Sequence, residues 1–359
     1  MPKSSLSAPI KTLIKIVVSL AFFLVLLSFV RTNELLGVFA RVNWLWVGLS
    51  FLVTVLMMGI GCAKWKTVLD LRQRSLTFWE LLKIYTIGVF FSNILPSTFG
   101  GDVVRSYYAG KLINNQSYAA ISVFVERFSG MVFLLFLVAV APFFQPDLLR
   151  SPYLFVPAIF GIFLGTTILW VFFSDRPLAL LASLGKILVN AMKRLPLRKG
   201  GGILRPWLRF GEQLTSRLLS RMEKIKAEMA LAATAIRSDA RFIAKMVLLT
   251  LCFYVLSWLN VYSAFEAFNV AVSFLAICAL VPAIMIVAQL PVTLLGNLGY
   301  FESVFVFYFL LVGIDGAETL AMGLLLRIKL LCVGGIGFFV YLLYKRKYQL
   351  APDNRLTEG

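Results

Sequence analysis

The chain has 359 residues, of which 60% are hydrophobic and 14% are charged, and its formal net charge is +18. Soluble domains have roughly 45–50% apolar and about 25% charged residues, so this composition excludes a soluble protein and predicts an integral membrane protein. The lack of histidine and the isolation of four cysteines in apolar runs exclude Ser-His-Asp triads, histidine metal sites and CxxC-type zinc or redox sites. We therefore expect no cofactor and no metal.

Six segments approach the roughly 20 apolar residues that a helix needs to cross a bilayer. The first has a basic start, as a signal peptide does, but no small-residue cleavage site follows, so we expect a retained span. The six expected spans are Leu13–Val30, Trp44–Ala63, Ala119–Phe144, Leu154–Phe173, Phe242–Phe265 and Glu318–Leu343.

Two further apolar segments are interrupted. Leu81–Leu95 runs into a string of Pro, Ser, Thr and Gly that ends at Asp102, and Val272–Leu290 runs into a similar string that ends at Gly299. Proline and glycine break a helix, and the exposed backbone is tolerated in a membrane only where protein or a water-filled cavity covers it. We therefore predict two re-entrant helical hairpins.

The two interrupted regions form an internal repeat. Leu95-Pro96-x4-Gly101 matches Leu290-Pro291-x4-Gly296, and a span precedes and follows each. Counting spans makes the first hairpin enter from the cytoplasm and the second from outside, so the halves are inverted, as in many secondary transporters. The expected fold is an all-α polytopic membrane protein, an inverted repeat with about six full spans and two re-entrant helical hairpins.

The charge pattern divides the chain. We expect a first membrane half at 1–175, with an extra N-terminal span before repeat 1, a basic linker at 176–241, a second membrane half at 242–345 and a tail at 346–359. Arg176–Lys245 holds 15 basic and 4 acidic residues, a balance of +11. The positive-inside rule places this stretch and both termini in the cytoplasm, which predicts a multi-pass protein of the cytoplasmic (inner) membrane.

The basic linker has two interpretations. Pro206–Ile236 carries apolar residues at helical spacing with interleaved Arg and Lys, which favours an amphipathic helix on the inner leaflet. The alternative is a solvated linker that only joins the repeats. Anionic inner-leaflet lipid explains the positive charge without a nucleic-acid partner, so we expect no nucleic acid to bind.

Ionisable residues inside apolar segments are costly and are candidate site residues. Asp102 follows Gly100-Gly101 and would cap the returning half-helix, while Arg105 lies one turn further. The amides, the helix dipole and Arg105 together suit a phosphate or a carboxylate. In the alternative, Asp102 and Arg105 only pair to hold the hairpin closed.

The remaining intramembrane charges are expected to pair across the interface between the repeats. Glu126 would pair with Arg127 or Arg105, and a structural role is favoured for the Glu126-Arg127 step. Glu302 would pair with Arg327, and its position makes it the acid best placed for protonation or cation coupling.

Three motifs carry a family resemblance. They are Asn93-Ile-Leu-Pro-Ser-x-x-Gly-Gly-Asp102-x-x-Arg105, Val125-Glu126-Arg127 and Leu290-Pro-x4-Gly-x-x-Gly-x-x-Glu302. With them the chain resembles the lysylphosphatidylglycerol synthase transmembrane (flippase-like) family from about Leu36 to Leu343. One departure is Leu294-Leu295-Gly296-Asn297, where a doubled glycine like that of the first hairpin is expected.

The resemblance implies a function. Larger members, the multiple peptide resistance factors, join this module to a cytoplasmic aminoacyl transferase that charges phosphatidylglycerol with lysine, and the module is associated with flipping the product. Sixteen residues follow Leu343, which leaves no room for such a domain, so the resemblance implies a stand-alone flippase-like module.

We therefore expect a lipid flippase or transporter that moves a polar, phosphate-bearing lipid or glycolipid headgroup, with membrane lipids and envelope glycolipid or lipid-modifying enzymes as partners. The alternatives are an integral membrane transferase with Asp102 or Glu302 as general base, and a scaffold for envelope enzymes. No nucleotide-binding motif is present, so we expect no enzyme activity. The candidate headgroup-binding residues are Asn93, Pro96, Ser97, Gly100, Gly101, Asp102, Arg105, Glu126, Arg127, Pro291, Gly296, Gly299, Glu302, Arg327 and Lys329.

Overall fold

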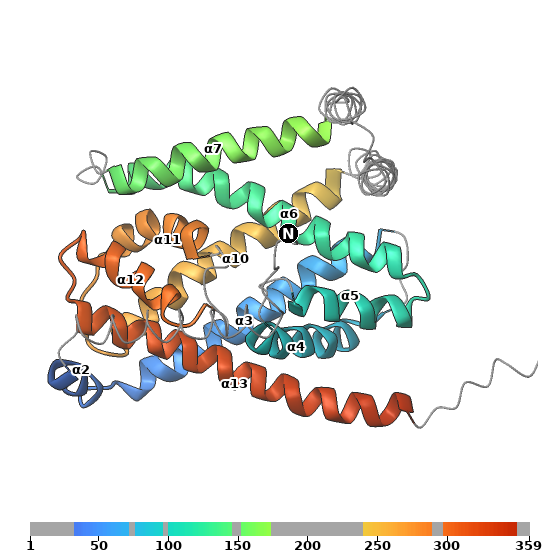
Figure 1. Cartoon of the computed structure of the whole chain (residues 1–359), viewed down its shortest axis with the longest axis horizontal. Helices are drawn as coiled ribbons and strands as arrows, with labels where there is room; N and C mark the ends of the chain where they lie inside the picture. The colour runs from blue at the N-terminus through green and yellow to red at the C-terminus, as the bar shows by residue number, and fades with distance from the viewer. Residues whose placement is uncertain are drawn as a thin grey trace, which may run out of the picture. The chain divides into compact units, whose positions relative to one another are not determined.

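A computed structural model describes residues 32–71, 76–95, 100–145, 152–173, 240–288 and 297–349 (Figure 1). Every regular element among these residues is a helix, which confirms the all-α class. The expected span Leu13–Val30, nearly all of the basic linker with its amphipathic helix, and residues 350–359 lie outside the described residues. So do Pro96, Ser97, Pro291 and Gly296 of the two predicted breaks.

The helices follow the predicted order. The first part of the chain contains α2 (Thr32–Phe39), α3 (Trp44–Leu69), α4 (Phe78–Ile94), α5 (Gly100–Leu112), α6 (Gln116–Val140), the 3-10 helix η1 (Ala141–Phe144) and α7 (Pro152–Phe173). The second contains α10 (Ala240–Glu266), α11 (Phe274–Ala288), α12 (Tyr300–Leu310) and α13 (Gly316–Gln349). The chain forms two compact units, 1–159 with 244–359 and 160–243, and the residues of the candidate site lie in the first unit.

Polar residues start the membrane helices of the first half. The side chain of Asn43 accepts a hydrogen bond from the Leu45 amide ahead of α3, and Asn115 does the same for Tyr118 ahead of α6. Thr77 and Glu80 form a reciprocal capping box ahead of α4. Such caps satisfy amides that the first turn of a helix leaves without partners, and so they set where each helix begins.

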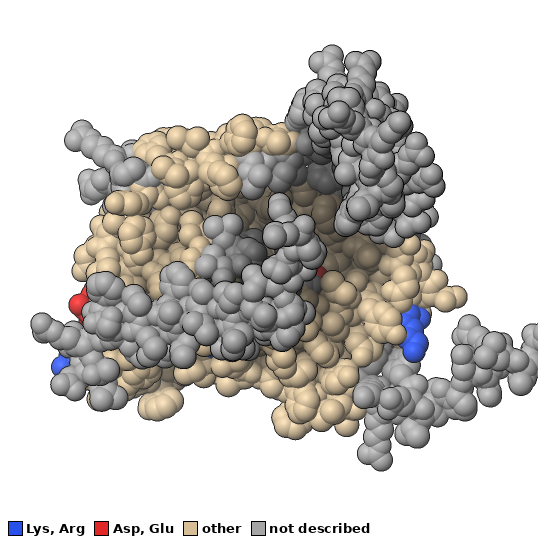
Figure 2. Space-filling view, viewed as in Figure 1, with Lys and Arg blue, Asp and Glu red and all other residues tan. Residues whose placement is uncertain are grey.

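Four helices, α3, α6, α10 and α13, are long and apolar enough to cross a membrane, which confirms four of the six expected spans. Helix α7 has 22 residues and covers the whole expected span Leu154–Phe173. Exposed large apolar side chains line these helices, as lipid-facing positions require. In the view of Figure 2, the charged side chains lie mainly at the two ends of the described surface, with uncharged residues between them.

The predicted repeat is present in the order of the helices. A long helix, a hairpin of two short helices and a second long helix occur as α3, α4–α5, α6 and again as α10, α11–α12, α13. The hairpin arms have 17, 13, 15 and 11 residues, fewer than the roughly 20 of a full span. The arms of the second hairpin fold back on each other, because Tyr300 Oη donates to the Val287 carbonyl at 2.9 Å.

The leading helices of the two halves run antiparallel. The Asn43 amide donates to the Ala267 carbonyl at 2.8 Å, and Thr54 Oγ1 donates to Asn260 Oδ1 at 3.2 Å, so residue numbers rise along α3 where they fall along α10. The halves also exchange partners, because α4 packs against α13 and α11 packs against α6. Antiparallel leading helices and reciprocal packing are what an inverted repeat produces.

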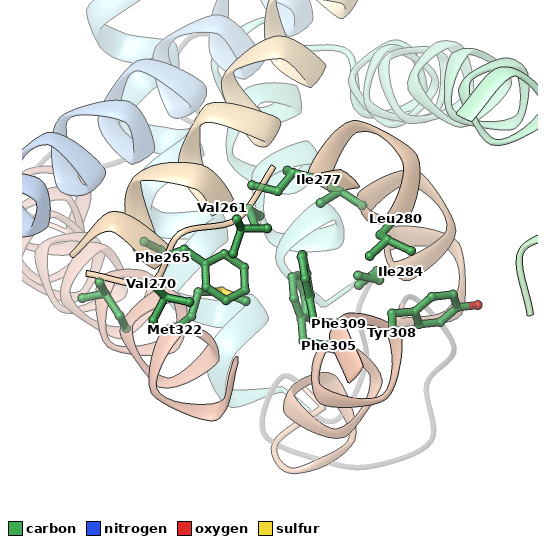
Figure 3. Packing of buried hydrophobic residues seen from close by; sticks show 14 of the residues in the cluster. Val261, Phe265, Val270, Ile277, Leu280, Ile284, Phe305, Tyr308, Phe309 and Met322 are labelled. Carbon is green, nitrogen blue, oxygen red and sulfur yellow. The ribbon is translucent and has the colours of Figure 1, made fainter. Parts of the chain in front are cut away.

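The largest hydrophobic cluster holds the second half together. Figure 3 shows Phe265 of α10 beside Phe309 of α12, and their ring centroids lie 4.7 Å apart. Leu280 and Ile284 of α11 and Met322 of α13 are fully buried around these rings. In a membrane, close packing of this kind holds helices together, so this cluster fixes the short second hairpin against α10 and α13.

Candidate functional site

The doubled glycine at the start of α5 allows the first hairpin to close. A Cβ built on Gly101 would overlap the Gly88 carbonyl and Ser92 Oγ of α4, and one on Gly100 would lie 2.6 Å from the Leu95 Cβ. Both glycines are buried. Larger residues at these two positions would therefore clash with α4 and Leu95. The lack of side chains allows the first turn of α5 to pack directly against α4.

Asp102 lies in that first turn and is nearly buried. Its carboxylate accepts hydrogen bonds from two nitrogens of Arg127, with Nε 3.1 Å from Oδ2 and Nη2 3.1 Å from Oδ1. The Nε atom of Arg105 lies 3.0 Å from Oδ1. Asp102 thus joins one arginine from its own helix and one from α6.

Arg105 is the most buried cation of this group, with 2% of its surface exposed. Its Nη2 donates to Glu126 Oε2 at 2.6 Å, and its guanidinium carbon lies 5.1 Å from the Trp65 ring and 5.2 Å from the Tyr85 ring. Its Nη1 atom is buried and has no hydrogen-bond partner among the described residues. The Nη1 group of Arg105 is therefore a hydrogen-bond donor that no described residue uses.

Lys64 completes this group, and sequence reasoning missed it. Its side chain is 5% exposed, and its Nζ would lie 3.1 Å from a Cβ built on Gly130 of α6. The expected span ended at Ala63, whereas α3 continues through Lys64 to Leu69. The sequence did contain a signal for the longer helix, namely the apolar residues Trp65, Val68 and Leu69 after Lys64. These residues extend the helix and are buried in the structure.

We call Lys64, Asp102, Arg105, Glu126 and Arg127 the first charged cluster. Three cations face two carboxylates, so its formal charge is +1. Arg127 is the accessible member, with 55% of its side chain exposed, while the other four are buried or nearly so. An excess positive charge in a largely buried site favours an anion as ligand.

The second charged cluster is the pair Glu302 and Arg327. Glu302 Oε1 accepts from Arg327 Nε at 2.8 Å, and its Oε2 accepts from the Gly299 amide at 2.8 Å. Gly299 has a φ of 80°, which glycine adopts without strain. Glu302 is fully buried, and the Arg327 guanidinium lies 5.3 Å from the Phe301 ring. This cluster carries no net charge.

The ion pairs are part of the repeat. Asp102 is the third residue of α5 and Glu302 the third of α12, and each pairs with an arginine 25 residues later. The predicted pairing of Glu302 with Arg327 is confirmed. Of the two partners expected for Glu126, the structure selects Arg105.

The expectation that these pairs cross the interface between the repeats is wrong. Each pair joins the returning arm of a hairpin to the next long helix within one half. The reason is the short connection, residues 113–115 in the first half and 311–315 in the second, which makes the two helices antiparallel neighbours. Their facing side chains meet before those of the other half can reach them.

Lys329 stands apart from both clusters. Its Nζ donates to Asn260 Oδ1 at 2.6 Å and to the Ser50 carbonyl at 3.4 Å, and it contacts Ser50 Oγ. Lys329 is 1% exposed, and the partners it contacts are neutral. It therefore ties α13 to α3 and α10, across the two halves.

Asn93 also acts between helices. Its side-chain amide donates to the Leu330 carbonyl at 3.0 Å, and the same amide nitrogen fills the space beside Gly334. It links α4 to α13 and has no contact with the charged clusters among the described residues. Of the candidate residues, the structure thus brings together Asp102, Arg105, Glu126 and Arg127 in one site and Gly299, Glu302 and Arg327 in another.

Comparisons with known proteins place the chain in a family. Residues 12–336 match the family described as Lysylphosphatidylglycerol synthase TM region. The chain belongs to this family. The UPF0104 membrane protein MJ1595 of Methanocaldococcus jannaschii is 30% identical over 137 residues, which are 37% of this chain and 41% of that protein. The chain thus spans about two fifths of that relative's length, and no solved structure matches it.

In this member of the lysylphosphatidylglycerol synthase transmembrane family, the two clusters differ in what they can do. The second is a closed, balanced pair whose carboxylate is fully used by Arg327 and the Gly299 amide. The first has surplus positive charge and one accessible arginine. No group of three His, Cys, Asp or Glu residues that could hold a metal occurs among the described residues.

Proposed function

We propose that this multi-pass membrane protein is a flippase-like transporter that moves a polar, phosphate-bearing lipid or glycolipid headgroup across the cytoplasmic membrane, with both termini in the cytoplasm. Its partners are membrane lipids, with anionic inner-leaflet lipid at the basic linker and envelope glycolipid or lipid-modifying enzymes beside it. Family membership and the inverted arrangement of the halves support this proposal.

The observation that carries the proposal is the unused donor of Arg105. A buried donor without a partner costs about 1–3 kcal/mol, and more when it belongs to a charged group. A phosphate oxygen beside Nη1 would remove that cost. The first turn of α5 adds the positive end of the helix dipole near this cluster, and Arg127 offers an exposed second cation.

The second charged cluster has a supporting role in this proposal. It repeats the ion pair of the first cluster without the surplus charge. In this proposal it holds the second hairpin against α13, and the ligand binds only at the first cluster. Transport then follows from a change in how the two halves pack, with the headgroup passing the first cluster while the acyl chains stay in the bilayer. The protein performs no covalent chemistry in this scheme.

The test uses purified protein in vesicles with acyl-NBD-labelled phosphatidylglycerol and an impermeant quencher that reports lipid in the outer leaflet. We expect Arg105→Gln to lower the rate of headgroup translocation at least about tenfold, the effect of losing one charge-assisted hydrogen bond. The double variant Arg105→Gln/Glu126→Gln removes both charges together and should fold as the native protein does while remaining inactive. Labelled glucosylceramide, which lacks phosphate, should move slowly with every variant.

Contrary outcomes are specific. Unchanged translocation by Arg105→Gln, or equal movement of the phosphate-free lipid, would show that the first charged cluster is not a phosphate seat. A covalently modified lipid formed by the purified protein, and lost in Asp102→Asn, would instead establish the transferase alternative. The scaffold alternative would be established by two results in cells. A variant with all intramembrane charges removed would keep native activity, and a variant with residues 205–226 deleted would lose it.

A further inference from the structure

Four helices enclose a groove outside the charged clusters. Its volume is about 950 Å³, and its lining comes from α3 and α4 of the first half and from α10 and α13 of the second. Gly59, Trp79, Cys252 and Ile336 represent these four helices in the lining. The hydroxyl of Thr86 is already bonded to the Lys83 carbonyl at 2.8 Å, so it offers no free donor to a ligand.

We propose that this groove holds an alkyl chain of the lipid whose headgroup the first charged cluster recognises. The inference rests on the proposed function for the identity of that lipid. Three of the four lining helices are spans, so the groove opens where the surrounding medium is hydrocarbon. A polar ligand would lose its hydration there without gaining a partner, whereas an alkyl chain loses nothing.

The groove adjoins the first charged cluster along two helices. Ala63 and Thr86 line the groove, and the residues next to them, Lys64 and Tyr85, belong to or contact the cluster. Gly61 keeps α3 and α4 close at this point, since a Cβ there would lie 2.5 Å from Tyr85 Oη. One amphiphile can therefore place its charged end and its apolar end on the same pair of helices.

The groove also has walls from both halves of the repeat. A change in the packing of the halves would alter its width, because α3 and α4 would move relative to α10 and α13. The protein would thus hold or release the alkyl chain of the lipid at the same time as its headgroup. This gives the protein a way to select lipids with long alkyl chains over free phosphate compounds.

Gly59 offers a position from which a larger side chain can fill the groove. A Cβ built there meets nothing within 4 Å, and Gly59 lines the groove. Gly48 lies on the same helix, is exposed, also has open space around a built Cβ, and is absent from the groove lining. Gly59→Phe and Gly48→Phe are therefore a matched pair that changes helix propensity equally.

The experiment uses phosphatidylglycerol with a photoactivatable diazirine in the middle of an acyl chain, with full-length protein in phosphatidylcholine vesicles. Mass spectrometry should find labels concentrated on the groove-lining residues. Gly59→Phe should reduce that labelling, because the ring occupies space that the alkyl chain would fill, and Gly59→Leu should reduce it less. Gly48→Phe should label as the native chain does.

Even labelling over the exposed apolar residues of α3, or full labelling of Gly59→Phe, would overturn the groove assignment. The two proposals fail separately in this design. Groove labelling that persists while Arg105→Gln translocates normally would remove the headgroup seat and keep the groove. Translocation that depends on Arg105, with no groove-specific labelling, would remove the groove and keep the transporter.

Discussion

At the scale of single residues, the charged groups fall into three settings that differ in how their charge is compensated. Glu302 and Arg327 compensate each other, Arg105 is compensated but retains a free donor, and Lys329 is held by neutral oxygens of Ser50 and Asn260. A buried charge without compensation is the most expensive of these. The three settings should therefore respond differently to substitution.

Glu302→Gln should destabilise the protein strongly. The amide can still accept from the Gly299 amide, but the Arg327 guanidinium is left buried without a counter-charge. Removing one partner of such a pair costs about 3–5 kcal/mol. Thermal unfolding in detergent should show a clear drop in Tm for the single variant and partial recovery for Glu302→Gln/Arg327→Met. Equal Tm values for Glu302→Gln and the native protein would contradict this assignment.

Lys329→Met should be tolerated, in contrast. The methionine removes the buried charge, and Thr54 Oγ1 still lies within reach of both the Ser50 carbonyl and Asn260 Oδ1. With lysine in place, Asn260→Ala should cost about 1–3 kcal/mol, because the ammonium loses a hydrogen bond. In Lys329→Met the same Asn260→Ala change should cost much less, and a double-mutant cycle measures the difference. Additive effects would show that the 2.6 Å contact contributes nothing.

At the scale of elements, the broken helices could be predicted and their side-chain contacts could not. A proline followed by glycines has a local effect on the backbone, so the hairpins and the repeat were visible in the sequence. The partner of Glu126 depends on which face of α6 turns towards α5, which no local pattern determines. Lys64 was missed for a related reason, since its burial comes from helices far away in the chain.

Gly101→Ala should destabilise the first hairpin. The added methyl group would meet the Gly88 carbonyl and Ser92 Oγ, and the carbonyl cannot move without shifting α4. Overpacking of this kind costs about 1–3 kcal/mol. The Tm should fall for Gly101→Ala and stay unchanged for Gly48→Ala, which adds the same methyl group on an exposed face of α3. A native Tm for Gly101→Ala would mean that the two arms do not pack this closely.

At the scale of the whole molecule, the proposed transport requires the two halves of the inverted repeat to move relative to each other. The contacts between the halves include the antiparallel packing of α4 on α13, where Phe90 and Phe338 have ring centroids 5.1 Å apart. Contacts within each half include the ion pairs of both charged clusters. If the halves move as bodies, the first kind of contact must change during transport and the second kind must persist.

A covalent link between α4 and α13 should therefore stop translocation. Phe90→Cys and Phe338→Cys, joined by a short bifunctional maleimide in a background that lacks the accessible Cys252 and Cys332, would fix the two halves in one arrangement. The same linker between Tyr262→Cys of α10 and Phe274→Cys of α11, which both belong to the second half and are not fully buried, should be harmless to the movement of the halves. The measurement is the NBD-lipid translocation rate before and after linking. Full translocation by the linked α4–α13 variant would require the movement to occur inside one half, and the hairpins would then replace the halves as the moving bodies.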